Sequence, residues 1–191
     1  MSPFTTTMLG FNEVLERAKS VNALLTEEEK KVFVEYASKV PDNGIIVDIG
    51  TARGGSAFIF ALASPPSVKV YTVDPVSNQH FFSARERLGL EDKLIFINKP
   101  SKEAVGDVPI PIDLLFIDGV HSRTGVAEDF ESYGKNVLPE GFAMFHDYFY
   151  YDGIKAAVDE LEEDGRIKKH LLVDSLFQGE RRTGLFIAKV L

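Results

Sequence analysis

Acidic or polar residues stand at the end of four short apolar runs in this 191-residue sequence. They are Asp48 together with Gly50, then Asp74, Asp118 and the pair His146-Asp147. Ligands of an open α/β sheet bind outside the carboxyl ends of its strands, so we expect these residues to converge at one edge. A single acid there can also be the N-cap of the next helix. Four of them, together with a glycine-rich loop, indicate a binding site rather than four separate caps.

The glycine-rich loop is the stretch VDIGTARGGS, residues 47–56. Gly50 allows a turn that a side chain would block, and Gly54-Gly55 allow the next helix to begin close to a ligand, with free N–H groups at its start. Asp74 follows about 20 residues later, where a carboxylate can accept both hydroxyls of a ribose. The glycine spacing is not that of the dinucleotide fingerprint, and there is no P-loop. The pattern therefore favours an adenosine-containing ligand and disfavours NAD, FAD and ATP.

The elements that must position these residues alternate between strand and helix from Gly44 onward. The expected strands are Ile45–Ile49, Val68–Val73, Leu94–Asn98, Leu114–Ile117 and Phe142–Phe145. The expected helices are Ser56–Ala63, Gln79–Leu88, a short Ser101–Val105, Thr124–Val137 (closed by Pro139-Glu140-Gly141) and Gly153–Asp164. Two further β-type runs, Leu171–Phe177 and Gly184–Val190, flank Gln178–Thr183 and predict a closing hairpin.

Two helices are expected before this core. Helical apolar spacing runs from Phe11 to Leu25, and a capping box, Thr26 with Glu29, begins a second helix that extends to about Lys39. We therefore predict an α/β fold: a Rossmann-like, doubly wound, mostly parallel seven-stranded sheet with an antiparallel C-terminal hairpin. Residues 1–191 are expected to form one domain, with a helical extension over residues 1–40 and the α/β core over residues 44–191.

Composition excludes several classes of function. The formal net charge is −8, which disfavours nucleic-acid binding because that depends on basic surface. The absence of cysteine removes disulfides and thiolate chemistry. No signal peptide or membrane-spanning run is visible, so we expect a cytoplasmic protein without a membrane partner. A homo-oligomer is left open, with the N-terminal amphipathic helix and the closing hairpin as the first surfaces to suspect.

The motifs resemble those of the class I S-adenosylmethionine (SAM)-dependent methyltransferases. VDIGTARGGS is similar to their first motif and VYTVDP to their second, while IDLLFIDGVHSRTGVAEDF and LPEGFAMFHDY resemble a branch of small O-methyltransferases that includes macrolide-sugar methyltransferases and cephalosporin-hydroxylase-like proteins. The resemblance covers roughly residues 44–191. It implies SAM as cofactor, with Asp74 on the ribose, Ser101 near the adenine and the first loop facing the methionine part. The cofactor residues so implied are Asp48, Gly50, Thr51, Gly54, Gly55, Ser56, Asp74, Ser101 and Asp118.

The same resemblance implies methyl transfer to a hydroxyl of a small molecule. His121, three residues beyond Asp118, matches the base of some relatives, and an imidazole can take a proton near neutral pH. Asp118, His146 and Asp147 match the positions that bind magnesium in metal-dependent relatives. His146 departs from the two adjacent acids often found there. Magnesium prefers oxygen ligands, so an imidazole shifts preference toward manganese or another softer ion, and the metal requirement is left open.

Two other functions are weighed against this one. A non-catalytic SAM-binding or interaction protein on the same fold would also fit the missing second acid. An NAD-linked oxidoreductase fits Asp74 but lacks the glycine spacing and a substrate domain. The aromatic run over residues 148–151 could line an acceptor pocket, belong to the core or form an oligomer contact, and the sequence does not choose between these.

Overall fold

The computed structural model describes residues 9–19, 21 and 24–191. Its strands are β1 (Ile45–Ile49), β2 (Lys69–Val73), β3 (Leu94–Ile97), β4 (Ile112–Ile117), β5 (Val137–Phe145), β6 (Ile167–Val173), β7 (Leu176–Phe177), β8 (Arg181–Arg182) and β9 (Leu185–Val190). Its helices are α1 (Phe11–Ala18), α2 (Glu27–Ser38), α3 (Gly55–Ala63), α4 (Gln79–Leu88), α5 (Ser101–Ala104), α6 (Arg123–Tyr133) and α7 (Asp152–Glu163). Two 3₁₀ turns, η1 (Val105–Asp107) and η2 (Gly134–Asn136), complete the secondary structure.

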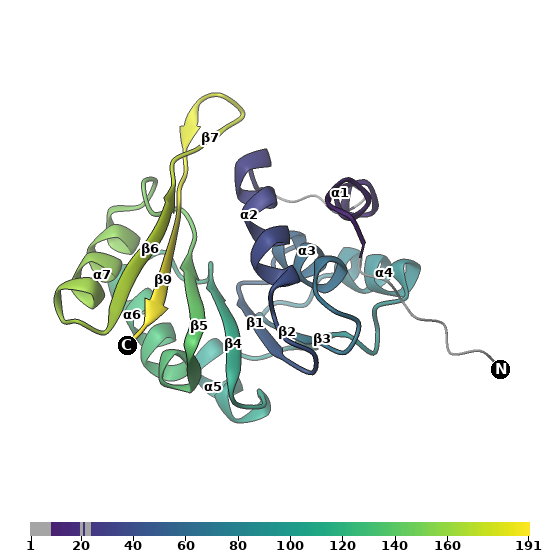
Figure 1. The fold of residues 1–191 in the computed structure, drawn as a ribbon, viewed down its shortest axis with the longest axis horizontal. Coiled ribbons are helices and arrows are strands. Elements are labelled where there is room, and N and C mark those ends of the chain that lie inside the picture. Colours follow the sequence, from purple (N-terminus) through teal and green to yellow (C-terminus); the bar gives the residue numbers. More distant parts are fainter. Residues whose placement is uncertain (1–8, 20, 22–23) are drawn as a thin grey trace.

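Seven of the strands form one sheet in the order β3-β2-β1-β4-β5-β9-β6 (Figure 1). The pairs from β3 to β5 are parallel, whereas β9 runs antiparallel to both β5 and β6. The order reverses direction between β1 and β4, which is the switch point where ligands of such sheets bind. The predicted seven-stranded, mostly parallel fold with antiparallel C-terminal strands is confirmed.

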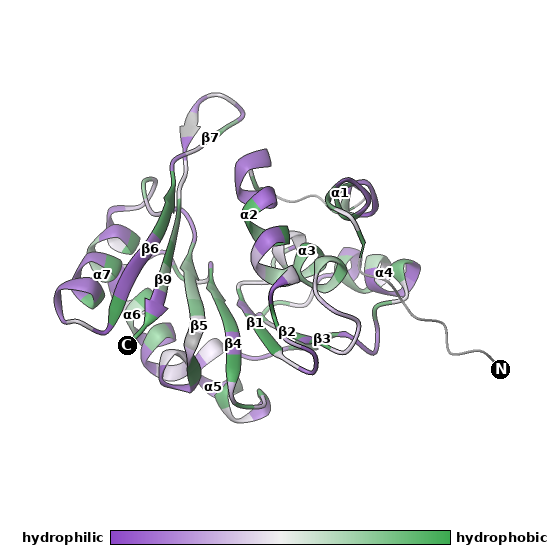
Figure 2. Cartoon of the chain, in the orientation of Figure 1, coloured by the Kyte–Doolittle hydropathy of each residue, from purple (hydrophilic) through white to green (hydrophobic). Residues whose placement is uncertain are grey.

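Alternate residues of the central strands face two separate hydrophobic layers. Leu114 and Phe116 of β4 pack with the layer under α1 to α4, while Leu115 and Ile117 pack with the layer under α5 to α7. A strand buried on both faces is expected to be apolar along its whole length. Figure 2 shows this in the apolar colouring of β1, β4 and β5, against the polar outer faces of α2 and α7. The two layers leave only the ends of the strands open to a ligand.

The N-terminal helices pack on α3 and lie on the same face of the sheet as α3 and α4 (Figure 1). The predicted capping box is confirmed: the hydroxyl of Thr26 accepts from the Glu29 N–H, and the Glu29 carboxylate accepts from the Thr26 N–H. The helix predicted over Phe11–Leu25 is shorter, because α1 ends at Ala18. Residues 20, 22 and 23 of that prediction lie outside the described residues.

Two predicted boundaries near the C-terminal half are wrong. The helix expected to reach Val137 ends at Tyr133, and Val137 begins β5, so Pro139-Glu140-Gly141 lie inside the strand instead of closing a helix. The strand accommodates them through a shift of register against β4 between Ile112 and Leu114. The predicted closing hairpin is confirmed and is longer than expected: β6 pairs with β9, and β7 pairs with β8 beyond the main sheet.

Within the described part of the chain, no helix combines the length and apolarity needed to cross a membrane.

Candidate functional site at the carboxyl ends of the strands

The glycine-rich loop follows β1 and turns back against β4. Gly50 has φ +100° and donates from its N–H to the carbonyl of Val73 at 2.9 Å. A Cβ at position 50 would lie 2.2 Å from the carbonyl oxygen of Asp118. Gly54, with φ +89°, caps the start of α3, whose first N–H groups therefore open toward the loop. Both glycines are required by the backbone, as their positions in the motif predicted.

Asp48 lies beneath this loop and is fully buried. Its carboxylate accepts from the hydroxyls of Ser56, at 2.6 Å, and Thr72. Burial raises the pKa of the Asp48 carboxyl to about 7, against the lowering effect of the two hydroxyl donors. Its oxygens are thus engaged inside the protein, where they hold the loop onto β2. This geometry favours a supporting role for Asp48 rather than direct contact with a cofactor.

Asp74 stands at the end of β2 and shapes the other wall of the loop. One carboxylate oxygen accepts from the Ala52 N–H at 3.0 Å and the other from the Val76 N–H at 2.8 Å. Ala52 has φ +44°, a left-handed conformation that is uncommon without glycine. Strained backbone of this kind often marks a ligand-binding loop. The carboxylate is exposed enough to take further hydrogen bonds from a ribose.

A cavity of about 340 Å³ opens at the loop. Its lining combines loop residues, the end of β4 and the segment before α2: Leu24, Leu25, Gly50, Thr51, Ala52, Arg53, Gly55, Ser56 and Asp118. Five of the predicted cofactor residues are therefore at the cavity. Leu24 and Leu25 were not predicted here, because nothing local indicates that the residues just before α2 reach this loop, and Arg53 was included only as part of the loop.

Ser101, predicted near the adenine, makes contacts within the protein. Its hydroxyl donates to the buried carboxylate of Asp129 on α6, and its carbonyl accepts from the Tyr133 hydroxyl at 2.7 Å. These bonds fix the turn after β3 against α6. The role of Ser101 toward a cofactor stays a prediction.

Asp118, His121 and Asp147 converge at the ends of β4 and β5. One ligand atom from each lies within 4.8 Å of the others, a spacing at which the three could hold one metal ion. His121 Nε2 is 3.3 Å from Asp118 Oδ1, and the His121 ring stacks on Tyr151 with 4.4 Å between centroids. Asp147, two residues after β5, adopts φ +57°, an uncommon backbone conformation for a residue other than glycine. The structure thus brings His121 together with the two acids.

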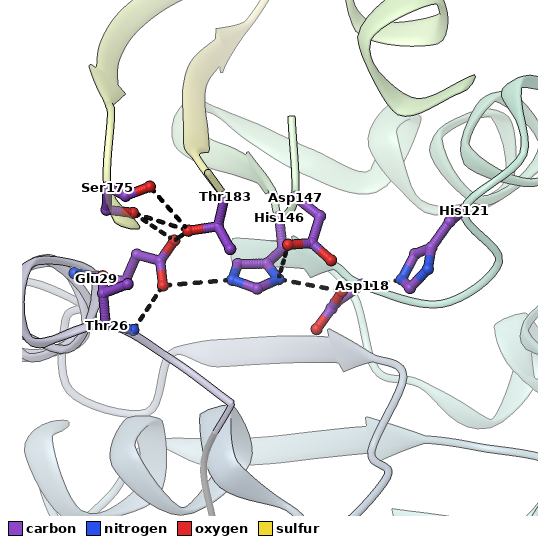
Figure 3. Close-up of polar contacts among 8 residues, drawn as sticks. All are labelled: Thr26, Glu29, Asp118, His121, His146, Asp147, Ser175 and Thr183. Atoms are coloured by element: carbon purple, nitrogen blue, oxygen red, sulfur yellow. Dashed lines mark hydrogen bonds and ion pairs between the residues drawn. The ribbon is translucent and has the colours of Figure 1, made fainter. Parts of the chain in front are cut away.

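His146 is buried next to this group and lies between its two acids and Glu29 (Figure 3). Its Nδ1 is 3.3 Å from Asp118 Oδ1 and 3.7 Å from Asp147 Oδ1, while its Nε2 is 3.5 Å from Glu29 Oε2. Burial alone would lower the pKa of His146, but Asp118 and Glu29 outweigh it and hold that pKa well above its usual value. His146 is therefore a buried imidazole between carboxylates that favour its protonated form.

The two carboxylates that flank His146 respond in the opposite sense. Burial would raise the pKa of Asp118, yet the imidazoles of His146 and His121 lower it to about 2. Burial likewise opposes ionisation of Glu29, whose pKa falls to about 2 because His146, Thr26 and Thr183 stabilise the charged form. Glu29, Ser175 and Thr183 were missed as site residues. The only sequence signal at Glu29 was its capping box, which gives no hint of a second role.

Comparison with known proteins identifies the family. The sequence profile of the family described as "Methyltransferase domain" matches residues 47–148, more than half of the chain and all of the motifs discussed above. No curated protein matches the sequence.

Solved structures share the fold at low sequence identity. An O-methyltransferase from Bacillus cereus in complex with SAH has a TM-score of 0.71 and 17% identity over 94% of this chain and 90% of its own. A cofactor-bound protein from MTB has a TM-score of 0.76 and 14% identity over 99% and 93%. An rRNA methylase from Streptococcus thermophilus has a TM-score of 0.66 and 21% identity over 86% and 95%. At these identities the neighbours establish the fold.

The glycine loop and Asp74 at the end of β2 both lie in the matched region, as do β2 to β5 of the sheet. The chain belongs to the methyltransferase-domain family, the class I SAM-dependent methyltransferases that its motifs resemble.

Proposed function

We propose that this protein methylates a hydroxyl group of a small molecule, with help from a divalent cation. One observation carries the proposal: Asp118 both lines the cavity at the glycine loop and belongs to the group with His121 and Asp147. Methyl transfer is an in-line displacement, so the donor and the acceptor oxygen must be held side by side. A residue shared by the cofactor cavity and the acid–histidine group supports that arrangement.

The cofactor half of the site fits SAM, which supplies a methyl group activated by its sulfonium. Asp74 would accept the ribose hydroxyls with a carboxylate already held by two backbone N–H groups. Arg53 lines the cavity and matches the carboxylate of the methionine part, because a guanidinium binds carboxylates with paired hydrogen bonds. Gly50 and Gly54 have no side chains, so the ligand can approach the backbone of the loop.

The metal half fits a divalent cation by its donors and its charge. Asp118, Asp147 and Glu29 are three carboxylates, and His146 is the one cation among them, so these four groups sum to −2. Asp118 and Asp147 would hold the cation, with His121 as the third donor. Two oxygens and one nitrogen suit manganese better than magnesium. A bound cation would lower the pKa of the acceptor hydroxyl, so that its proton could pass to water, and would stabilise the alkoxide that remains.

His121 is proposed as the base in the protein without metal. When its Nε2 carries the proton and donates to Asp118, Nδ1 is left to accept a proton from the acceptor hydroxyl. Stacking on Tyr151 holds the ring in place. A protonated His146, by contrast, has no lone pair for a metal, and both of its nitrogens face carboxylates. We therefore assign His146 to charge balance rather than to metal binding.

A small acceptor is favoured over RNA by the net charge of −8, since RNA binding depends on neutralising phosphates. The test begins with calorimetric titration of SAH and of NAD into the protein. We expect saturable binding of SAH alone, lost in Asp74→Ala and kept in the distant exposed control Asp164→Asn. Binding of NAD in place of SAH would contradict the proposal.

Turnover is then measured as SAH formation with a catechol, a simple phenol, a monosaccharide and a short RNA. Each probe is tested after EDTA treatment and after addition of Mn²⁺. We expect methylation of a hydroxyl probe, stimulated by Mn²⁺ and reduced by Asp147→Asn. SAH binding without turnover on any probe would instead support a non-catalytic SAM-binding protein. Methylation of the RNA probe alone would overturn the assignment of the acceptor.

A further inference from the structure

Glu29 is a capping residue that is entirely buried. A capping box requires one carboxylate oxygen, and such residues usually stand at an exposed helix start. Here Oε2 accepts from the Thr26 N–H at 2.8 Å and also lies 3.5 Å from His146 Nε2. Burying a carboxylate is costly unless its partners compensate. The cap alone does not explain why this charge is placed in the interior.

The second oxygen of Glu29 holds the C-terminal hairpin. Oε1 accepts from Ser175 Oγ at 3.0 Å and from Thr183 Oγ1 at 2.9 Å, and the two hydroxyls lie 2.9 Å from each other. Ser175 comes just before β7 and Thr183 just after β8, so the Glu29 carboxylate is hydrogen-bonded to both ends of the hairpin. Figure 1 shows the hairpin projecting past the sheet on the side where α2 begins.

On its other side, Glu29 faces the reaction centre through His146. Figure 3 shows the side chains in sequence: the hairpin hydroxyls, Glu29, His146, Asp118 and then His121. His146 is 4% exposed, and its two nitrogens lie 3.5 Å from Glu29 and 3.3 Å from Asp118. A side chain held between two carboxylates has little freedom to rotate, and it restricts Asp118 in turn. Groups that orient a ligand in this way affect metal affinity or activity roughly 10- to 100-fold.

Building on the proposed function, we propose that Glu29 is a positioning residue for methyl transfer. Through His146 it fixes the orientation of Asp118, and through Ser175 and Thr183 it holds the β7–β8 hairpin beside the site. Both α2 and the hairpin lie outside the matched residues 47–148. Glu29 is thus the point at which the two flanking segments are tied to the reaction centre of the family core.

The test separates the two interactions of Glu29, the one with His146 and the one with the hairpin hydroxyls. Glu29→Gln keeps the size of the side chain and an oxygen for the cap but removes the charge that faces His146. A double variant, Ser175→Ala with Thr183→Val, removes the hairpin bonds and leaves the Glu29–His146 pair. Glu28→Gln is the matched control, because Glu28 is the exposed neighbour on the same helical turn. Each protein is checked for folding by circular dichroism and for SAH affinity by calorimetry.

Glu29→Gln is expected to reduce kcat roughly 10- to 100-fold and to weaken Mn²⁺ binding by a similar factor, with SAH affinity within about twofold of the wild type. The double variant is expected to raise the KM of the acceptor with a smaller effect on kcat. The Glu28→Gln control should behave as the wild type. Wild-type kcat and Mn²⁺ affinity in Glu29→Gln would overturn the inference, because a purely structural cap would leave both unchanged.

A failure of the proposed function is recognised separately, as absence of turnover and of Mn²⁺ binding in the wild type. In that case hydrogen exchange decides the inference. The amides of His146 and Thr183, bonded to the carbonyls of Ile117 and Ser175, should exchange faster in Glu29→Gln than in Glu28→Gln. Equal exchange in the two variants would overturn it.

Discussion

The two halves of the site hold their carboxylates in different ways. On the cofactor side, Asp48 and Asp74 are held by neutral donors, namely hydroxyls and backbone N–H groups. The other half, called the acceptor half below, consists of the proposed metal group together with His146 and Glu29. There, Asp118 and Glu29 lie on either side of the buried imidazole of His146. Burial raises the pKa of Asp48 despite its hydroxyl donors, whereas the imidazole of His146 lowers the pKa values of Glu29 and Asp118. The carboxylates of the cofactor half thus depend on hydrogen bonds from neutral groups, and those of the acceptor half depend on the charge of His146.

The largest effect is expected from removing the cation of the acceptor half. His146→Gln would leave Glu29 and Asp118 buried without a counter-charge, and breaking a buried ion pair in this way costs about 3–5 kcal/mol. We expect that loss in urea unfolding at neutral pH, with little change in His80→Gln, whose ring is exposed. Equal stability of the two variants would show that the acceptor half does not depend on charge.

The buried carboxylates of the two halves, Asp48 on one side and Glu29 with Asp118 on the other, should change stability with pH in opposite directions. The pKa of Asp48 is raised to about 7, so its contribution is present below pH 4 and is lost as pH rises toward 7, a change on the order of 4 kcal/mol at most. The pKa values of Glu29 and Asp118 are lowered to about 2, so their contribution is present above about pH 4.5 and is lost as pH falls toward 2.

Two variants isolate these slopes in unfolding experiments across pH 2–8. Asp48→Asn should flatten the decline between pH 4 and 7, and Glu29→Gln should flatten the decline below pH 4.5. A wild-type slope in Asp48→Asn would place the neutral pH dependence elsewhere in the protein.

A substitution at Gly50 tests the contact between the two halves, because Gly50 of the loop packs against the backbone of Asp118. Gly50→Ala would place a non-glycine residue at φ +100° and a Cβ 2.2 Å from the Asp118 carbonyl. Strain of this kind costs about 1–3 kcal/mol, and relief by movement of β4 would disturb both halves together. We expect lower stability and weaker binding of both SAH and Mn²⁺. Gly106→Ala is the control, because open space surrounds that position.

The smallest effect is expected from a change confined to the cofactor half. Asp74→Asn keeps one acceptor oxygen, so SAH affinity should fall roughly tenfold, about 1.4 kcal/mol, while Mn²⁺ affinity stays within about twofold. Calorimetry of both ligands measures the two numbers on one sample. An equal loss of both would mean that the halves are coupled through Asp74 and are not separable.

The residues of the cofactor half could be predicted from sequence because they are close together in the chain and stand at the ends of predicted strands. Gly50, Gly54 and Asp74 lie in one β-α-β stretch whose spacing predicts their placement. The prediction of α2 and its cap at Glu29 succeeded for the same reason, since its partner is three residues away. The start of β5 at Val137 was missed because a helical pattern runs up to it and the strand continues past Pro139.

The acceptor half was only partly predictable. Asp118, His121, His146 and Asp147 were all named, but the sequence could not show that His146 also faces Glu29. That contact depends on Glu29 of α2, whose carboxylate is also bonded to Ser175 and Thr183, 146 and 154 residues away along the chain. Contacts between residues so far apart produce no local pattern that can be recognised in a single sequence.

The position of β9 also bears on how the protein is made. β9 lies between β5 and β6 in the sheet, although it follows every other strand along the chain. While the ribosome is still synthesising residues 185–190, β1 to β5 can already pair, but the outer edge of β5 stays open and β6 has no neighbour. An open strand edge invites pairing with other chains. A folding intermediate that lacks β9 is therefore open to aggregation through the edge of β5.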